Sequence, residues 1–546
     1  MRGLNTLSNA FTQYPQTVAT QQLAEEDLDT VRGFALKVQD HLSDRTFERF
    51  PYAFPSISLP SVRQTCRRLQ NLAGFQSVLY DCCPNSCMCY TGPHDCLDHC
   101  IYCKQPRRDE AGKPRQTFKY IPFIPRLRAA HANKARAQLM QYRAHQHHHK
   151  PGQTTDIFDS TGYRDLLHSK VTVNGQELPY HFFSDPRDIA LGLSTDGFAP
   201  FKKRKQTTWP IILFNYNLPP DIRIHMGNII ELGTIPGPKK PKDADSYLFP
   251  AVQELAQLEQ GVTAFDSLSD SLFVMHAYLL RVFGDIPAIS MLMRMKGHNG
   301  TCPCRMCNII GIRAPGEKTL YVPLDRRNLI TDGAPAEPTR YDPAALPLRN
   351  HLEFMGQAHR VQNATTDAEE KRLSQSFGIK GVPLLSTLSA LSFPASFPYD
   401  FMHIVWENLI PNLVLLWTGQ FKGFGGDDDY QLAKPVWEAI GEASAASSRT
   451  TPSTFGAPMP NIASEKYQFS AENWSFWTLY LAPSLLHRRF LNDRYHQHFV
   501  ELVRLLNICL QFEISDDEIE TVRAGMIKWV EDYERYDLFA FRVSAD

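Results

Sequence analysis

The chain lacks an excess of charge of either sign. Its 546 residues include 57 Lys and Arg against 58 Asp and Glu, which gives a formal net charge of -1. A protein that binds nucleic acid through its overall charge is strongly basic, so this balance excludes that mode of binding. Any contact with a polyanion must come from local basic patches.

Long apolar runs and an N-terminal targeting signal are also lacking. The longest apolar stretches, such as Leu413 to Trp417, are far too short to span a bilayer. The polar N-terminus has no charged-then-apolar signal pattern. We therefore expect a soluble cytosolic or nuclear protein with no membrane partner. Its 12 cysteines should then be metal ligands or free thiols rather than disulfides.

The composition predicts a folded chain of more than one domain. Hydrophobic residues make up 43% and aromatic residues 11%, which is enough to bury a large core. Because single cores rarely grow past about 250–300 residues, 546 residues should form more than one domain. Short apolar runs predict strands over 189–195, 209–216 and 228–235, and a helix over 249–260. The next apolar run, 271–283, suits a strand or a helix. This order of elements predicts an α/β fold.

Eight of the cysteines fall within residues 66–103. The spacings Cys83-x3-Cys87 and Cys100-x2-Cys103 fit a four-cysteine zinc site closed over a short loop. Alternative ligands, or ligands for a second ion, are Cys89, Cys96, His94 and His99. The extra cysteines could equally be ordinary buried thiols. A RING-like ubiquitin ligase module is a rival interpretation, but the spacing is too compressed for eight ligands.

A basic stretch follows the cysteines and favours phosphate binding. Residues 104–150 hold twelve Lys and Arg against two Asp and Glu, and a solvated basic helix is the alternative. Further basic patches, 202–205 and 239–242, flank the predicted sheet. The candidate DNA-binding side chains are Arg107, Arg108, Arg126, Arg128, Lys134, Arg136, Lys202, Lys203, Arg204 and Lys205.

A second cysteine motif, Cys304-x2-Cys307, is half of a zinc site. It needs two more ligands, and His403 is the best candidate. His298, His351 and Asp400 are alternatives, and a metal-free pair of thiols remains open.

Three acidic residues stand in contexts that favour holding a divalent metal. Asp196 follows the strand predicted over 189–195, and Asp285 follows the apolar run that ends at Phe283. Glu407 lies on a predicted helix over 399–418, on one face with Asp400 and His403. Two carboxylates at strand ends and a third from a helix can hold two magnesium ions for phosphodiester cleavage. The alternatives are turn aspartates and a solvated His/Glu pair.

Taken together, several motifs resemble the transposases of CACTA-type (En/Spm-like) DNA transposons, especially the variant of mushroom-forming fungi. The similar stretches cover about residues 80–420. They are 83–87 with 100–103, 118–126, 185–201, 235–239, 284–288 with the Cys304/Cys307 pair, and 400–409.

The resemblance implies an RNase H-like catalytic core of the DD(E/D) superfamily. Asp196, Asp285 and Glu407 would be its catalytic acids and would hold Mg²⁺ or Mn²⁺. Zn²⁺ would be held by Cys83, Cys87, Cys100 and Cys103, and by Cys304, Cys307 and His403. The implied activity is metal-dependent cleavage and strand transfer at transposon ends in the nucleus. The implied partners are double-stranded DNA and further copies of the chain.

Residue ranges follow from this assignment. We expect a loosely ordered segment (1–65, with one helix over about 24–43), a zinc-binding and basic region (66–165), the first part of the core (166–296), an insertion with the CxxC (297–398), the catalytic helix (399–425) and a helical C-terminal region (426–546). Because such transposases usually extend much further, we expect a truncated member.

Two other functions stay open on the sequence. One is a catalytically inactive, transposon-derived zinc protein that binds DNA or protein. The other is a metallohydrolase that uses Asp400, His403 and Glu407 around one ion and needs neither Asp196 nor Asp285.

Overall fold

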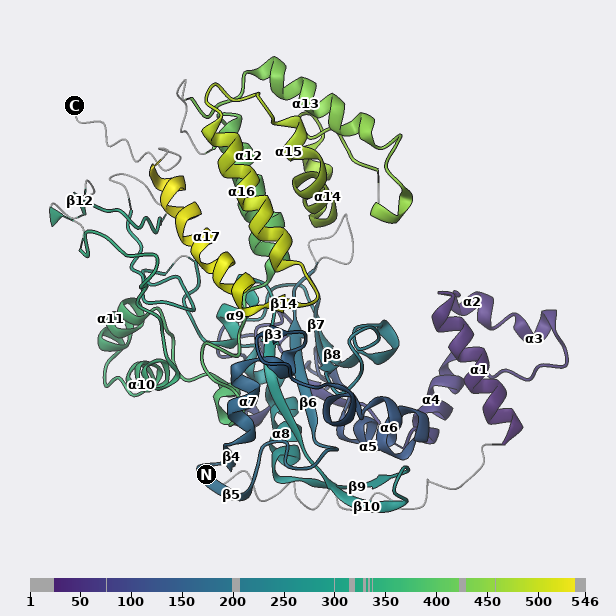
Figure 1. Cartoon of the computed structure of the whole chain (residues 1–546). Coiled ribbons are helices and arrows are strands. Elements are labelled where there is room, and N and C mark those ends of the chain that lie inside the picture. The colour runs from purple at the N-terminus through teal and green to yellow at the C-terminus, as the bar shows by residue number, and fades with distance from the viewer. Residues whose placement is uncertain are drawn as a thin grey trace.

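The computed structural model shows a mixed α/β protein with a helical C-terminal part (Figure 1). The residues it describes are 24–74, 76–198, 207–298, 300–313, 320–327, 330–331, 334–335, 337–421, 429–456 and 458–535. Within these ranges, no helix combines the length and apolar character needed to cross a membrane.

A six-stranded mixed sheet forms the centre of the fold. Its strands, in spatial order, are β1 (Val78–Asp81), β2 (Thr117–Tyr120), β8 (Ile230–Ile235), β7 (Trp209–Asn215), β6 (Ile189–Thr195) and β11 (Ala277–Phe283). β8, β7 and β6 run antiparallel in succession, and β11 pairs parallel with β6. Six of the seven residues of β6 are buried, as expected for a central strand covered on both faces.

The strands predicted over 189–195, 209–216 and 228–235 are confirmed as β6, β7 and β8. The ambiguous run 271–283 is two strands, β10 (Ser271–Met275) and β11. β10 forms a hairpin with β9 (Val262–Asp266). The two halves look alike in composition, but β10 alternates exposed and buried residues while β11 is buried over nearly its whole length.

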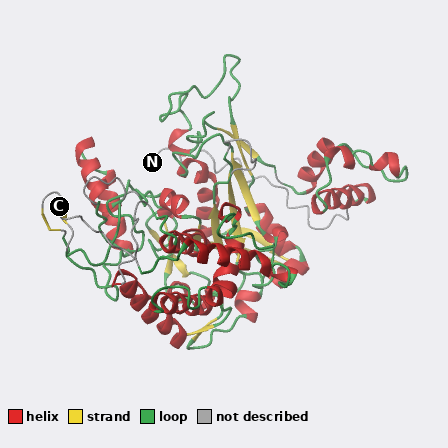
Figure 2. Ribbon diagram, turned by 90° about the horizontal axis from the view of Figure 1, so that it is seen from above, coloured by secondary structure: helices red, strands yellow, loops and turns green. Residues whose placement is uncertain are grey.

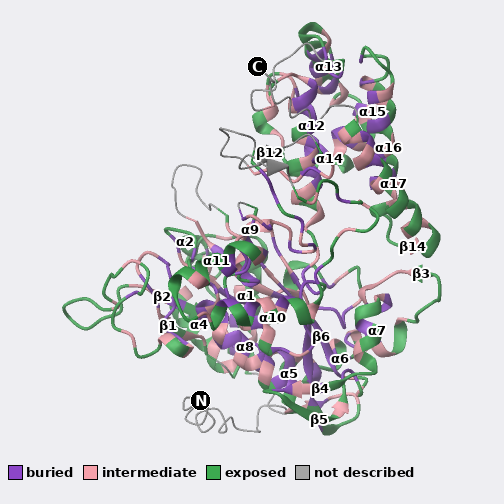
Figure 3. Ribbon diagram, turned by 90° about the vertical axis from the view of Figure 1, so that its left-hand side faces the viewer, coloured by how far each residue is buried: buried purple, intermediate pink, exposed green. Residues whose placement is uncertain are grey.

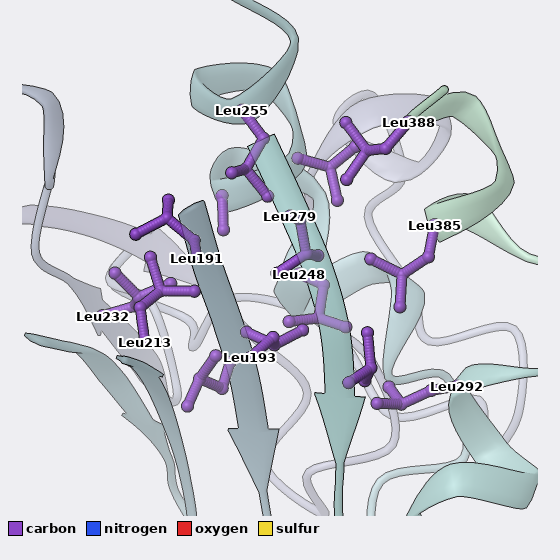
Figure 4. Packing of buried hydrophobic residues seen from close by; sticks show 14 of the residues in the cluster. Leu191, Leu193, Leu213, Leu232, Leu248, Leu255, Leu279, Leu292, Leu385 and Leu388 are labelled. Atoms are coloured by element: carbon purple, nitrogen blue, oxygen red, sulfur yellow. The ribbon is translucent and has the colours of Figure 1, made fainter. Parts of the chain in front are cut away.

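The helix α8 (Asp245–Gln260) packs on β11 and confirms the helix predicted over 249–260. Leu248 and Leu255 of α8 meet Leu193 of β6 and Leu279 of β11 in the core (Figure 4). Leu385 and Leu388 join them from the segment predicted as an insertion. That segment therefore contributes to the same core as the sheet.

The C-terminal part has its own hydrophobic core, which centres on α12 (Ile410–Trp417) and α16 (Arg494–Cys509). Figure 3 shows buried residues gathered around β6 and again along these helices. The helix predicted over 399–418 begins as a π-helix, Met402–Leu409, and continues as α12.

The N-terminal helices stand to one side of the sheet (Figures 1 and 2). They are α1 (Glu25–Gln39), α2 (Asp44–Phe47), α3 (Phe50–Ala53) and α4 (Val62–Leu72). The sequence predicts only the first of them before residue 65. The short helices α2 and α3 escape a periodicity argument because neither is much longer than one turn.

The remaining elements are short or peripheral. The helices are α5 (Ile124–Ala132), α6 (Lys134–Leu139), α7 (Thr161–Leu167), α9 (Ile286–Leu292), α10 (His351–Gln362), α11 (Asp367–Phe377), α13 (Lys434–Ser447), α14 (Ala471–Phe476), α15 (Ala482–Leu485) and α17 (Asp516–Arg535). The strand pairs are β3 (Gln153–Thr154) with β14 (Ile514–Ser515), β4 (Lys170–Val173) with β5 (Gln176–His181), and β12 (Ile330–Thr331) with β13 (Ala334–Pro335).

Near the end of α8, Glu259 is 1% exposed, and neither carboxyl oxygen has a hydrogen-bond partner of regular geometry among the described residues. Burial raises the pKa of Glu259 to about 8, and the nearby backbone of Ser389 and Ala390 offsets this only in part. Because the folded-state pKa is raised, the folded chain holds a proton that the unfolded chain releases. Stability therefore falls as the pH rises from the ordinary glutamate value of 4.5 to about 8.

Glu259→Gln should thus increase the free energy of unfolding at pH 8 by about 1–3 kcal/mol, with little change near pH 5. Urea denaturation at the two pH values measures this. Glu254→Gln on the same helix is the matched control: burial raises the pKa of Glu254 as well, but hydrogen bonds from Tyr120, Phe123 and Ile124 to its carboxylate offset this and are weakened in the amide. It should be neutral or destabilising. Equal responses of the two variants would contradict the assignment.

Candidate metal and nucleic-acid site

Asp196 and Asp285 lie at the same edge of the sheet. β6 and β11 are parallel neighbours in which Ser194 pairs with Phe283, and each aspartate comes two residues later. At Gly284, a Cβ would come 2.8 Å from the carbonyl oxygen of Thr195, so only glycine allows this close approach of the two strand ends. The carboxyl ends of parallel strands are a common place for ligand sites.

The two aspartates share one electrostatic environment. The pKa of Asp196 is raised, chiefly because burial disfavours its charged form, and also because Asp285 and Asp400 add negative charge. A hydrogen bond from the Gly197 N–H (2.6 Å) and the nearby His403 offset this in part. Because like charges face one another here, a bound cation would stabilise the ionised forms.

Asp285 has a structural role as well. Its carboxylate accepts a hydrogen bond from the N–H of Ala288 and thereby caps α9. An aspartate is among the preferred N-cap residues, which explains the turn-like Gly-Asp-Ile-Pro context. The cap fixes one oxygen of the carboxylate at the helix start.

Asp400, His403 and Glu407 share one helix face, as the sequence predicts. His403 places Nδ1 2.8 Å from Oδ2 of Asp400 and Nε2 3.7 Å from Oε2 of Glu407. Burial lowers the pKa of His403, but the hydrogen bond and charge of Asp400, with Glu407 and Asp196, outweigh it and raise the pKa. The imidazole thus connects the helix to the aspartates of the sheet. Glu407 is the most open of the three, with its side chain 44% exposed.

The structure therefore brings Asp196, Asp285, Asp400 and His403 into one neighbourhood, and Glu407 adjoins it through His403. Among the described residues, the only metal-capable groups that gather three or more ligand atoms within 4.8 Å of one another are four cysteines. The acidic groups lie further apart than those thiols. Their assignment as catalytic ligands stays a prediction.

The four predicted cysteines form a compact cluster. The Sγ atoms of Cys83, Cys87, Cys100 and Cys103 all lie within 4.8 Å of one another, and three of the residues are buried. Four thiolates at this spacing suit the tetrahedral coordination of zinc.

Two tight turns build this cluster. Ser86, inside the first cysteine pair, and Lys104, directly after the second pair, both have positive φ (61° each) and let the chain reverse at these points. The N–H of Asn85 points at the sulfur of Cys83 (3.4 Å), an interaction that favours a thiolate.

The alternative zinc ligands lie outside this cluster. Cys82 and Cys89 pack in the main core, and Cys96 is exposed. His94 lies 2.9 Å from Asp243, and His99 belongs to a β-bridge with Pro106. The four-cysteine set is thus the one the fold gathers.

The second cysteine motif forms a pair without its proposed histidine. The Sγ of Cys304 lies 3.2 Å from the hydroxyl of Tyr399 and 3.3 Å from the N–H of Cys307. The hydrogen bond from the Cys307 thiol lowers the pKa of Cys304 to about 5. Both nitrogens of His403 face carboxylates instead. For His403 to bind zinc together with Cys304 and Cys307, its ring would have to turn away from Asp400 and Glu407.

Several predicted DNA-binding arginines have internal partners. Arg107 bonds Asp81 (2.6 Å), and Arg126 bonds the carbonyl of Glu231 (2.7 Å). Burial lowers the pKa of Arg128. Arg108 is exposed but lies 3.6 Å from Asp81, whereas Lys134 is exposed and Arg136 half-buried. Lys202, Lys203, Arg204 and Lys205 lie outside the described residues.

Lys240, in the basic patch 239–242, lies near Asp285. Lys240 has its Nζ 3.4 Å from the carbonyl of Pro287 and 5.3 Å from the ring of Trp209. Burial lowers its pKa, and the charge of Asp285 opposes that shift. Lys240 is therefore the positive neighbour of the acidic site.

The fold and these groups define a mixed α/β protein with a four-cysteine cluster that could hold zinc and an acidic group at a sheet edge. Residues 173–334 match the family model described as transposase family tnp2, which supports a transposase or a transposase-derived protein. The match contains Asp196, Asp285 and Cys304/Cys307, and excludes Glu407. No curated protein matches the chain.

Proposed function

We propose that the chain is a DNA transposase, or a protein derived from one, that cleaves and joins phosphodiester bonds at transposon ends. The observation that carries this is the pair Asp196 and Asp285 at adjacent parallel strand ends, inside the segment that matches the transposase family. The finer assignment, to CACTA-type elements of fungi, rests on the order of the sequence motifs.

An RNase H-like core is part of the proposal. Three successive antiparallel strands (β6, β7, β8), followed after a helix by a strand parallel to the first (β11), support it. The helix in that connection is α8, which covers the sheet. The third acid then comes from a helix beyond the insertion.

The donor set suits Mg²⁺ or Mn²⁺, because carboxylate oxygens are the ligands these hard cations prefer. Asp196, Asp285 and Glu407 are the residues we propose to hold the metal. A bound pair of such ions would supply Lewis acidity to the reacting phosphate and lower the pKa of attacking water.

The chain's own groups organise the site around those ligands. Asp400 hydrogen-bonds His403 and fixes its ring, which leaves Nε2 directed at Glu407. In the proposed reaction, water attacks phosphorus and displaces the 3′-oxygen at the transposon end. The freed 3′-hydroxyl then attacks phosphorus in target DNA and displaces the 3′-oxygen of the target strand. Double-stranded DNA is the partner, the nucleus the location, and a homo-oligomer the form that joins two ends.

The alternative is a zinc protein that binds DNA or protein without cutting. The exposure of Glu407 and its pairing with His403, rather than with the aspartates, favour this second function. Zinc in the four-cysteine cluster is common to both functions, so zinc content does not separate them.

Incubation of the purified chain with supercoiled plasmid carrying terminal-repeat DNA tests the proposal. Nicked and linear products should form with Mg²⁺ or Mn²⁺ and should be lost when these ions are withheld. Calcium serves as a control for non-specific effects of a divalent ion. Zinc-loaded protein that binds the DNA yet yields no product with either metal would favour the non-cutting alternative.

A further inference from the structure

A short β-bridge joins the end of α9 to the end of α11 and gathers positive charge. Met295 pairs antiparallel with Ile379, and both side chains are buried. The bridge is closed by hydrogen bonds from the Lys380 N–H to the carbonyl of Arg294 (2.6 Å) and from the Lys296 N–H to that of Gly378 (2.8 Å). The three basic residues flank the buried pair directly: Arg294 and Lys380 are exposed, and Lys296 is half-buried.

Gly378 fixes the position of this bridge. It ends α11 with φ 72°, and a Cβ there would come 2.4 Å from the carbonyl oxygen of Cys302. The chain after α11 is therefore held against the segment that carries the second cysteine motif. Residue 380 follows directly and is exposed.

Lys240 completes a cluster of four cations. Burial lowers the pKa of Lys380, and the charges of Lys296, Lys240 and Arg294 lower it further. Lys380 therefore lies close enough to each of the other three cations to be repelled by it. Lys240 also interacts with Asp285, so the cluster borders the proposed catalytic acids.

Little negative charge offsets the cluster. Among the residues that the structure describes, none of the four side chains forms an ion pair with a carboxylate. Arg294 does interact electrostatically with Asp245, but burial raises the pKa of that carboxyl to about 7. The loop of the four-cysteine module lies close by, since Tyr102 interacts electrostatically with Arg294 and lies 5.9 Å from the Nζ of Lys242.

We infer that Lys240, Arg294, Lys296 and Lys380 form a phosphate-binding surface that holds the backbone of duplex DNA beside Asp285. The inference rests on the proposed function and names where its substrate binds. Three of these cations lie on a fixed bridge and Lys240 lies near it, and all four are exposed or half-buried. Such a group of cations suits a polyanion. DNA releases counterions when cations approach its phosphates. Backbone contacts position a duplex without reading its sequence, so the surface should not discriminate between sequences.

The test is the salt dependence of duplex binding by Lys296→Gln/Lys380→Gln in the full chain. Fluorescence anisotropy with a labelled 30-base-pair duplex of arbitrary sequence, without added magnesium, measures affinity without cleavage. We expect affinity near 100 mM salt to fall about tenfold, and the slope of log K against log salt to become shallower by about two. Lys296→Arg/Lys380→Arg should restore both values, which separates loss of charge from loss of fold.

Lys170→Gln/Lys434→Gln is the matched control, because it removes the same charge from exposed positions paired with Glu177 and Glu438. It should bind as the parent does. The inference is overturned if the cluster variant keeps the parental slope, if both double variants lose affinity equally, or if the parent binds no duplex. Cleavage by the parent is measured separately, so the proposed function can stand when this surface fails.

Discussion

Asp196→Asn should lose about three orders of magnitude of Mg²⁺-dependent cleavage while keeping its fold. The amide oxygen of asparagine can still accept the hydrogen bond from the Gly197 N–H, so the local turn has no reason to change. What disappears is the negative charge that would hold the metal. A metal ion contributes several kcal/mol of transition-state stabilisation, and each 1.36 kcal/mol is a factor of ten in rate. Initial rates of plasmid nicking measure the loss.

Asp285→Asn should behave similarly, because asparagine is also a good N-cap and preserves the start of α9. Asp221→Asn is the matched control, as Asp221 is an exposed aspartate of the same part of the chain. It should cut at the parental rate. Full activity in Asp196→Asn, with thermal stability unchanged, would contradict the assignment of the acids.

The second large effect concerns the four-cysteine cluster. Cys100→Ser should release the zinc ion and lower the free energy of unfolding by more than about 3 kcal/mol, because metal binding and folding are coupled in such modules. Cys100 is completely buried, and its N–H bonds the carbonyl of Gln105 to close one of the two turns. Zinc content by elemental analysis and urea denaturation measure the two parts of this prediction.

Cys96→Ser is the control for that substitution, since Cys96 is exposed and lies outside the cluster. It should keep both zinc and stability. The cluster would be a set of ordinary thiols if Cys100→Ser retained the parental zinc content, or if the parent contained no zinc after purification without chelators.

The sequence carries enough information for the central strands. The run over 189–195 is almost continuously apolar, as a strand buried on both faces requires, and the runs over 209–216 and 228–235 keep enough apolar residues for one buried face. The run 271–283 was ambiguous, because composition does not reveal that its first half is a surface hairpin and its second a central strand. Pairing partners are a tertiary property.

The candidate site also combines features that the sequence predicts with features that only the structure shows. The four cysteines are recognisable because their spacings reflect two local turns. The approach of Asp196 to Asp285 depends on the parallel register of β6 and β11, which the spacing along the chain does not encode.

Two features of the site lay beyond sequence reasoning. The shared face of Asp400, His403 and Glu407 is predictable, but the sequence does not show that His403 Nδ1 bonds Asp400 while Nε2 lies 3.7 Å from Glu407, and its place in a zinc set stays a prediction. The basic bridge was also missed, since Lys296 and Lys380 come together only through the pairing of Met295 with Ile379. No local pattern marks that contact.

The central claim is that the sheet-edge aspartates hold a divalent cation. A crystal structure of the chain soaked in Mn²⁺, with anomalous scattering to locate the ion, tests it most directly. We expect manganese within about 2.0–2.6 Å of carboxylate oxygens of both Asp196 and Asp285. Manganese found only elsewhere, with both carboxylates free of metal at saturating concentration, would contradict the claim.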